Sequence, residues 1–185
     1  MASTLLRNVN PKYYKHGRGE QFLHEVASFC HPEALDFFES GVDVNYVDGN
    51  GQNALFYVGR KLNIAAEDRR NKIRATYEKL LAKGVKLNVR DKNKNTVAHA
   101  IAESGDIDLL SCLPFLAENG LDVTIRNKYL RSPLAVALRK FKQDPKTKPL
   151  VLAYYRAAEK KYRELYPDNT WLGRLKKAAG NILRK

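Results

Sequence analysis

The sequence predicts an all-α fold in which short pairs of helices stack side by side and polar turns project from one edge. This prediction depends on a stretch that occurs three times, beginning at Gly41, Gly84 and Gly120, and each time followed by a polar turn. Units of about 30 to 45 residues cannot bury a core alone, so repetition at this period indicates units that stack into a solenoid. We therefore first expect a binding scaffold.

The composition narrows the class of protein. With 185 residues, of which 44% are hydrophobic and 29% charged, the chain has room for one folded domain with or without an appendage. Its 33 Lys and Arg against 20 Asp and Glu give a net charge of +13, which favours an acidic protein, an anionic membrane or nucleic acid as partner. Residues 1–15 lack the apolar core of a secretory signal, and no stretch approaches the roughly 18 apolar residues that cross a bilayer. We therefore expect a cytoplasmic location.

Each unit is expected to contain two helices that follow a polar turn and end at a glycine. Four such units are predicted within one domain, 19–165, between a basic N-terminal segment, 1–18, and a C-terminal helix, 166–185. Their approximate bounds are 19–47, 48–90, 91–126 and 127–165.

Local signals place the helices of the second and third units. In the second unit, Asn53 is expected to cap the first helix and Gly84 to end the second. The stripe that this second helix should bury is Ile73, Tyr77, Leu80 and Leu81. In the third unit, helices are expected at 96–102 and 108–117. Pro114 should kink or delay the latter because proline has no backbone N–H to donate.

The first and fourth units complete the predicted row. The first has helical patterns at 22–27 and 32–39, although its leading turn is eroded, and an atypical terminal unit suits an array because its outer face meets water. In the fourth, Ser132 should cap the first helix, with Pro133 at the first helical position. The second helix, at about 150–165, is expected to direct inward Leu150, Ala153, Tyr154, Ala157 and Ala158.

These units resemble ankyrin repeats over about residues 19–160. The turn-and-helix signature of that family, Asp-x-x-Gly-x-Thr-Pro-Leu-His-x-Ala, is matched piecemeal in four copies, none of them complete. The matching residues are Asp48, Gly51 and Leu55; Asp91, Thr96 and His99; Ser132, Pro133, Leu134 and Ala137; and Leu23 and His24. The Gly-x-Asp-Val-Asn end of the repeat is matched by Gly41, Asp43, Val44 and Asn45. The resemblance implies an ankyrin-repeat solenoid with projecting β-turn fingers that binds other proteins.

The spacing of the units departs from that family. From Asp48 to Asp91 is 43 positions and from Asp91 to Asn127 is 36, whereas an ankyrin repeat spans about 33 residues. The second unit thus carries about ten extra residues, around 62–71, which should lengthen its helices or the loop between them. Because this insertion and its flanks are rich in Arg and Lys, the segment is a candidate contact surface of its own.

The C-terminal residues, 166–185, are expected to form a basic amphipathic helix after a break at about 166–170. An apolar face and several cations alternate at helical spacing there. Three roles remain open for this helix: to cover the last unit, to bind a membrane surface or partner, or to act as a transport or localisation signal. For the second role the candidate residues are Trp171, Leu175, Lys176, Lys177 and Ile182.

The sequence shows no recognisable active site. Cys30 and Cys112 lie in apolar helical patterns and are interpreted as reduced core thiols. Neighbouring helical residues point about 100° apart, so His31 is badly placed to act as a base for Cys30. His24 and His99 occupy the position at which the resemblance implies a structural hydrogen bond between repeats. No pair of residues has metal-ligand spacing and no phosphate-binding loop is present, so we expect neither an enzyme nor a cofactor or metal.

The resemblance also implies where a partner binds, which is a concave strip formed by the projecting turns and the exposed side of the first helices. The candidate residues from the turns are Tyr46, Asn50, Gln52, Arg90, Lys92, Asn95, Arg126, Lys128, Tyr129 and Arg131. Those from the first helices are Phe29, Arg60, Lys61, Glu103, Arg139 and Lys140. Because Asp43 and Asp48 belong to the first turn, that turn is weakly acidic, whereas the next two are strongly basic.

The leading hypothesis is a monomeric, non-enzymatic module that binds an acidic protein through this strip, since exposed Arg and Tyr often anchor interfaces. Alternatively, the lysines only keep the protein soluble, or the last helix anchors it to an anionic membrane, or an unrecognised enzymatic site exists. Nucleic acid is less favoured because the strip offers few aromatic side chains for stacking on bases. Irregular repeats resemble those of small ankyrin-containing effectors from intracellular bacteria and large viruses, which would act in the host cytosol. A eukaryotic adaptor would look much the same.

Overall fold

The computed structural model describes residues 19–37, 42–62 and 66–169. In these ranges every regular element is an α-helix or a 3₁₀ helix and no strand is present, which confirms the all-α prediction for them. The α-helices are α2 (Gly19–Phe29), α3 (Ala66–Ala82), α4 (Val97–Ser104), α5 (Ile107–Ser111), α6 (Leu113–Glu118), α7 (Pro133–Lys140) and α8 (Lys148–Leu165). The 3₁₀ helices are η2 (Pro32–Phe37), η3 (Ala54–Phe56) and η4 (Pro167–Asn169). The basic segment predicted at 1–18 lies outside the described residues.

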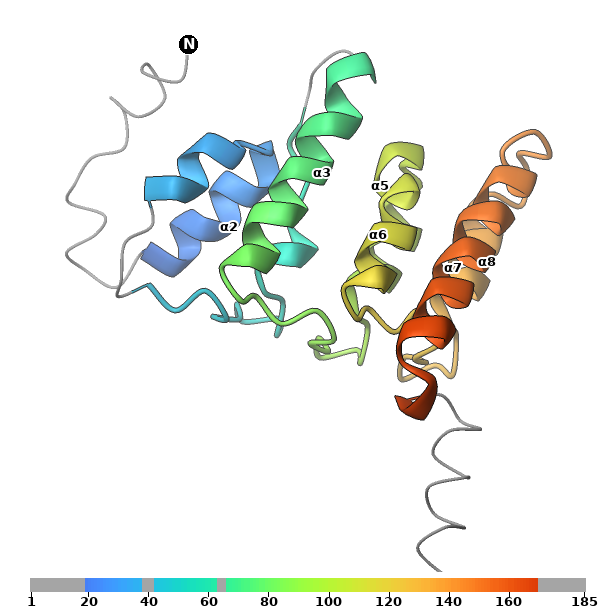
Figure 1. Ribbon diagram of the computed structural model, residues 1–185. Helices are drawn as coiled ribbons and strands as arrows, with labels where there is room; N and C mark the ends of the chain where they lie inside the picture. The colour runs from blue at the N-terminus through green and yellow to red at the C-terminus, as the bar shows by residue number, and fades with distance from the viewer. Residues whose placement is uncertain (1–18, 38–41, 63–65, 170–185) are drawn as a thin grey trace, which may run out of the picture.

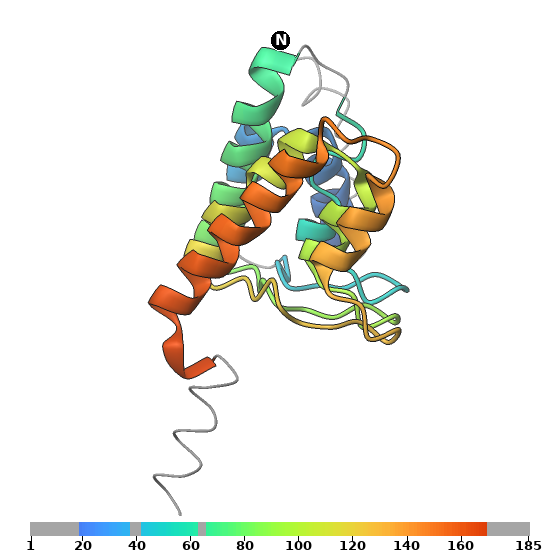
Figure 2. The same cartoon turned by 90° about the vertical axis from the view of Figure 1, so that its right-hand side faces the viewer.

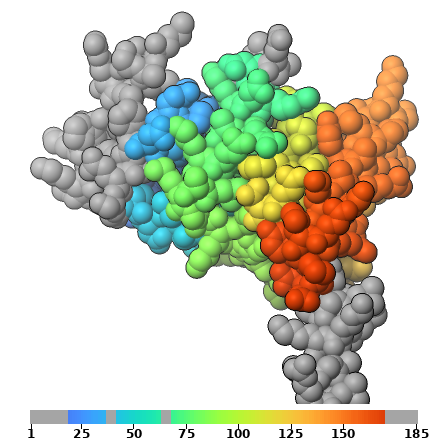
Figure 3. Space-filling view, viewed as in Figure 1, coloured from blue at the N-terminus to red at the C-terminus, as the bar shows by residue number. Residues whose placement is uncertain are grey.

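The helices form two adjoining rows (Figures 1 and 2). The first row consists of α2, η3, α4 and α7, and each contacts the next in that order. In the second row, η2 contacts α3, α3 contacts α5, and α6 contacts α8. Figure 3 shows α3, α6 and α8 side by side on one face of the molecule. Within each row the elements therefore follow the order of the chain.

One core of buried apolar side chains lies between the two rows. Three residues of the stripe predicted on α3, namely Ile73, Tyr77 and Leu80, are fully buried, and Leu81 packs partly buried against the core. Burying an apolar side chain of this size contributes roughly 1.5–3 kcal/mol. The core thus fixes the helix ends from which the connecting loops project.

Three of the predicted helix boundaries are present. The hydroxyl of Ser132 accepts a hydrogen bond from the backbone N–H of Ala135 at 3.3 Å, and Pro133 is the first residue of α7. The chain leaves α3 through Gly84, whose φ of +82° suits glycine. The interruption expected from Pro114 is also present, because α5 ends and α6 begins on either side of one residue.

The stripe predicted on α8 is right at Ala158, which is buried, and in part at Tyr154, which packs half-buried against the core, but it is wrong at its other three residues. Leu150 is 41% exposed and Ala153 and Ala157 are exposed as well, whereas the buried residues of this helix are Val151, Tyr155, Ala158 and Tyr162. The helix carries two overlapping apolar stripes. Only the buried one continues to its C-terminal end, because the next position of the predicted stripe is Lys161.

The first helix predicted for the second unit is reduced to the single turn of η3. Asn53 stands at its N-cap position but makes no capping bond; its side-chain amide instead donates to the carbonyl oxygen of Lys86 at 2.8 Å. The chain then turns at Gly59, whose φ is +76° and where a Cβ would lie 3.4 Å from Leu109. The helical segment in the first row is therefore shorter at η3 than at α4 or α7.

Most of the described extra residues of the second unit belong to α3. This agrees with the expectation that the insertion would lengthen a helix. The two arginines of this insertion differ in exposure, because the side chain of Arg70 is 57% exposed and that of Arg69 is largely covered. The separate contact surface stays a prediction. The side chain of Arg69 is only 17% exposed and forms ion pairs with Asp106 and Asp108, while Arg70 contacts the latter at 3.2 Å. These pairs join α3 to the N-terminus of α5.

Candidate interaction surface

Three loops of the same shape project from one edge of the first row. They are the first loop (48–52), the second loop (91–95) and the third loop (127–131), which begin at Asp48, Asp91 and Asn127. In each, the side-chain Oδ1 of the first residue accepts the backbone N–H groups two and four positions later, at 2.8 Å in the first two loops and 3.0 and 3.1 Å in the third. The backbone N–H of that residue donates to the carbonyl oxygen four positions later, at 2.9, 2.9 and 3.0 Å. One side chain thus closes each loop.

The loops are also joined to one another by the same pair of contacts. The backbone N–H of Lys92 donates to the carbonyl oxygen of Asn50, and that of Lys128 donates to Asn93, both at 2.9 Å. The last side chain of one loop also contacts the first side chain of the next loop. These contacts join Gln52 to Asp91 at 3.3 Å and Asn95 to Asn127 at 3.0 Å. The three loops therefore form one hydrogen-bonded ribbon.

A second line of contacts runs below the ribbon. The side chain of Asn45 accepts the N–H of Lys86 at 2.8 Å and donates to the carbonyl oxygen of Gly84 at 3.2 Å. Asn88 makes the equivalent pair with Asp122 at 2.9 Å and Gly120 at 2.7 Å. Each asparagine thereby ties the segment before one loop to the segment before the next, which fixes the spacing of the loops.

His99 ties the third loop to α4. Its Nδ1 accepts the backbone N–H of Thr96 at 3.1 Å, so its Nε2 carries the proton and donates to the carbonyl oxygen of Arg131 at 3.0 Å. Burial lowers the pKa of this imidazole. The structural hydrogen bond implied for His99 is thus confirmed.

His24 behaves differently from His99. Its ring stacks on Tyr57 with 4.5 Å between centroids, and burial lowers its pKa. The backbone of Tyr46 raises the pKa of this imidazole by less than burial lowers it, and its Nε2 forms no hydrogen bond of normal geometry. The hydrogen bond implied for His24 is therefore not present at this atom.

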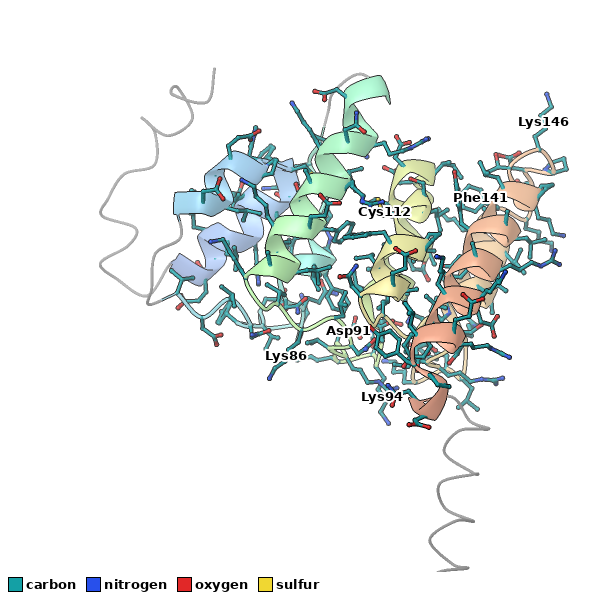
Figure 4. All side chains as sticks on the ribbon, in the orientation of Figure 1. Lys86, Asp91, Lys94, Cys112, Phe141 and Lys146 are labelled. Carbon is teal, nitrogen blue, oxygen red and sulfur yellow. The ribbon has the colours of Figure 1, made fainter. Side chains whose placement is uncertain are left out.

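Exposed charge on the second and third loops and their flanks is positive. Asp91 is buried, and its carboxylate is occupied by the loop bonds. Around it, the exposed charged residues of the two loops and their flanks are Arg90, Lys92, Lys94, Arg126, Lys128 and Arg131. The first loop has no cation among residues 48–52. Figure 4 shows Lys86, Asp91 and Lys94 together at the loop edge, with Lys146 at the opposite end of the molecule.

Several residues that were predicted to touch a partner instead make contacts within and between the loops. Arg60 lies over the ring of Tyr57, with its Cζ 4.4 Å from the centroid, and donates to the side-chain carbonyl of Gln52 at 2.9 Å. Arg90 donates to the backbone carbonyl of Arg126 at 2.7 Å. Together with the half-buried Asn95, these residues shape the ribbon. The side chains that extend beyond it belong to Lys92, Lys94, Lys128, Tyr129, Leu130 and Arg131.

Two of those side chains, Lys94 and Leu130, are absent from the predicted set. Both occupy the fourth position of a loop, which is Gly51 in the first loop. Aligning the three loops by their first residue would have identified this position in the sequence.

The remaining predicted residues belong to helices of the first row or to the segments on either side of η3. Phe29 is partly exposed at the end of α2, and the Nζ of Lys61 lies 5.3 Å from its ring centroid. Tyr46 is half-buried beside His24. The exposed side chains at the ends of α4 and α7 are Glu103, Arg139 and Lys140.

A hollow of about 360 Å³ lies between η3 and α4, beside the second loop. The hollow lies next to η3, the single helical turn that the second unit contributes to the first row. Exposed Arg60 and Glu103 line it together with buried Tyr77 and Leu109. The loops and the first row thus border a shallow depression.

The groups that could carry chemistry lie in the core. Cys30 and Cys112 are buried free thiols, as predicted, and burial raises the pKa of each to about 11. Within residues 19–37, 42–62 and 66–169, no cluster of three or more His, Cys, Asp or Glu residues could hold a metal ion. In the same ranges, no helix is both long and apolar enough to cross a membrane. The candidate residues Trp171, Leu175, Lys176, Lys177 and Ile182 lie outside the described part of the chain.

Comparison with known proteins adds no family. No protein-family model matches the sequence, and no curated protein matches it.

Proposed function

We propose that the chain is an irregular ankyrin-like solenoid that binds an acidic protein through its second and third loops and the adjoining side of the first row. Two observations support the solenoid: the elements follow chain order in both rows, and one set of hydrogen bonds recurs in three successive loops. Such arrays commonly use their extended side for binding.

The observation that carries the binding proposal is the separation of charge in the loops. The acidic residue that opens the second loop is buried and hydrogen-bonded, and Asn127 replaces an acid in the third loop. The cations around them are exposed. Because the loop backbones are joined to each other, these cations are held on a fixed support, which lowers the entropy lost on binding. An acidic surface is the complementary partner.

A non-enzymatic role is supported by the state of the candidate nucleophiles and bases. The raised pKa values of Cys30 and Cys112 keep both as thiols at neutral pH. Both ring nitrogens of His99 take part in structural hydrogen bonds. None of these groups lies on the exposed loop surface.

Charge reversal at the loops tests the proposal. The variant Lys92→Glu, Lys128→Glu, Arg131→Glu lowers the net charge from +13 to +7. The matched control, Lys142→Glu, Lys146→Glu, Lys148→Glu, makes the same change at the opposite end of the molecule, where Figure 4 shows Lys146. Each immobilised chain is used to capture proteins from cell extract, which are quantified by mass spectrometry.

We expect the wild type and the control to capture the same acidic proteins, and the loop variant to capture at least about tenfold less, equivalent to about 1.4 kcal/mol. Capture should also fall with added salt, because exposed charges are screened beyond about 8–10 Å at physiological ionic strength. Equal loss in both variants would show that net charge alone, rather than the loop surface, is responsible. Undiminished capture by the loop variant would refute the proposed interface.

A further inference from the structure

The fourth position of each loop adopts a left-handed backbone, but only the first loop has glycine there. The φ angles are +80° at Gly51, +59° at Lys94 and +59° at Leu130. Glycine takes this conformation freely, whereas a side chain with a Cβ crowds the following carbonyl group. A leucine at this position is therefore unfavourable for folding.

The side chain of Leu130 is also exposed. It is 74% exposed and that of its neighbour Tyr129 is 60% exposed, the two highest values among the large apolar side chains of the described residues. The backbone of Leu130 is nevertheless held, because its N–H donates to Asn127 at 3.0 Å and its carbonyl oxygen accepts from Arg126 at 3.4 Å. Two adjacent apolar side chains are thus presented to solvent on a fixed backbone.

Cations surround this apolar pair. The Nζ of Lys128 lies 5.0 Å and the Cζ of Arg131 5.8 Å from the ring centroid of Tyr129. Asn127 stands where the first two loops have aspartate, so the third loop contains no acid. The tip of the third loop, residues 128–131, therefore has an apolar centre, Tyr129 and Leu130, and a positively charged rim.

We propose that Tyr129 and Leu130 anchor the interface by inserting into an apolar patch of the partner protein, with the partner's carboxylates facing the surrounding cations. This inference rests on the proposed function and names the chemistry of the partner: acidic side chains around an apolar centre. Tyrosine and arginine are frequent anchors of protein interfaces, and such anchors lie at the centre of a contact with polar groups around them.

A protein fits this tip better than a lipid surface does. The hydrogen-bonded ribbon continues from the tip through the second loop to the depression beside η3, which gives one continuous surface with basic, apolar and polar parts. A bilayer would use the tip alone. Binding to an anionic bilayer is therefore an outcome that the test must distinguish.

The experiment uses a displayed library of random 16-residue peptides as the probe. The full chain is immobilised as wild type, as Leu130→Gly, and as the loop variant with Lys92, Lys128 and Arg131 changed to Glu. Lys94→Gly is the matched control, because it relieves the same backbone conformation at the same loop position but removes no apolar group. Thermal unfolding checks that Leu130→Gly is at least as stable as the wild type.

We expect peptides selected on the wild type to combine Asp or Glu with apolar residues. Their affinity for Leu130→Gly should fall at least tenfold, and their affinity for Lys94→Gly by less than threefold. Peptides selected afresh on Leu130→Gly should remain acidic but lose the apolar enrichment.

Four outcomes would contradict the inference. Acidic peptides without apolar enrichment, or unchanged affinity for Leu130→Gly, would overturn the anchor and leave the proposed function standing. No acidic enrichment on the wild type would overturn the proposed function and the anchor together. If, instead, the chain binds vesicles of phosphatidylcholine and phosphatidylserine in a 70:30 ratio but not pure phosphatidylcholine, and Leu130→Gly abolishes this binding, the tip recognises a membrane rather than a protein.

Discussion

The first loop and the third loop have the same backbone conformation but present different side chains to solvent. Both are closed by the side chain of their first residue, Asp48 or Asn127, through bonds to the same two backbone positions. Beyond that residue, the first loop has Gly49, Asn50 and Gly51, whereas the third has a lysine, a tyrosine and a leucine. The residue that shapes a loop is thus separate from the residues that could touch a partner.

The two loops also differ in which residues tie them to the first row. The third loop is bound to α4 through His99, whereas His24 makes no equivalent bond from α2 to the first loop. The first loop is instead bound next to η3, where the hydroxyl of Tyr57 donates to Asp48 at 2.5 Å and Arg60 donates to Gln52 at 2.9 Å. This difference can be tested by changing the closing residue, the fourth residue and the histidine in turn.

The largest effect is expected at a closing residue. Asp91→Ala removes the acceptors of two loop N–H groups at 2.8 Å and of two side-chain amides at 3.2 and 3.3 Å. Because bonds to a charged acceptor are worth about 1.5–3 kcal/mol and unsatisfied buried donors add a penalty, we expect a loss of about 3 kcal/mol in the free energy of unfolding. Urea unfolding at pH 7 measures it.

Asp91→Asn is the control for that prediction, because Asn127 closes the third loop with the same geometry. It should cost less, about 1–2 kcal/mol, since the side-chain oxygen that accepts the two loop N–H groups is kept, whereas the charge and the second oxygen, which accepts the amides of Gln52 and Asn95, are lost. Equal losses in the two variants would mean that the closing bonds do not set the shape of the loop.

Exchanging the fourth residues should change stability in opposite directions. Gly51→Leu should cost about 1–2 kcal/mol, because φ is +80° and a Cβ would lie 3.4 Å from the Cα of Asp91. Leu130→Gly should raise stability by up to about 1 kcal/mol, since relief of the left-handed leucine exceeds the added entropy of the unfolded chain. Chemical denaturation of both variants tests this, and a loss in Leu130→Gly would show that the leucine stabilises the loop.

Much of the fold could be predicted because its signals are local. The stripe with Tyr77 on α3, the cap at Ser132 and the break at Pro114 each depend on residues within about one turn of each other. The stripe of α8 was predicted only in part, with Ala158 correct, because that helix carries two stripes and its contact with α6 selects one. The helix shortened to η3 was missed because Gly59 packs against Leu109, fifty positions away.

The candidate surface was predictable only in part for the same reason. Composition and turn position were enough to place Lys92, Lys128 and Tyr129 on exposed loops. They could not show that Arg60 and Arg90 would bond to other loop residues, in the second case 36 positions away. Long-range partners are set by how the units stack, which the spacing of one unit does not reveal.

The smallest effect concerns the bond that Nδ1 of His99 accepts from Thr96, because a proton gained at Nδ1 removes this acceptor while Nε2 keeps its bond to the third loop. The pKa of His99 is lowered in the folded state, so between pH 6.5 and the folded value the unfolded chain binds more protons than the folded one. Its contribution to stability is therefore complete above pH 6.5 and is lost as the pH falls through the folded value. We expect the urea midpoint to be lower at pH 5.5 than at pH 7.5, by an amount equivalent to about one hydrogen bond, or about 1 kcal/mol.

His99→Gln separates this histidine from other titrating groups, because Gln can still accept the N–H of Thr96 in a capping box but has no charge to gain. The variant should lose about 1 kcal/mol at pH 7.5 through the missing bond to Arg131. It should also show a smaller fall between pH 7.5 and 5.5, with the remainder assigned to His24, whose pKa is lowered too. If the fall matches the wild type in full, His99 does not contribute to the pH dependence; if no stability is lost at pH 7.5, the third loop owes its support to the ribbon rather than to His99.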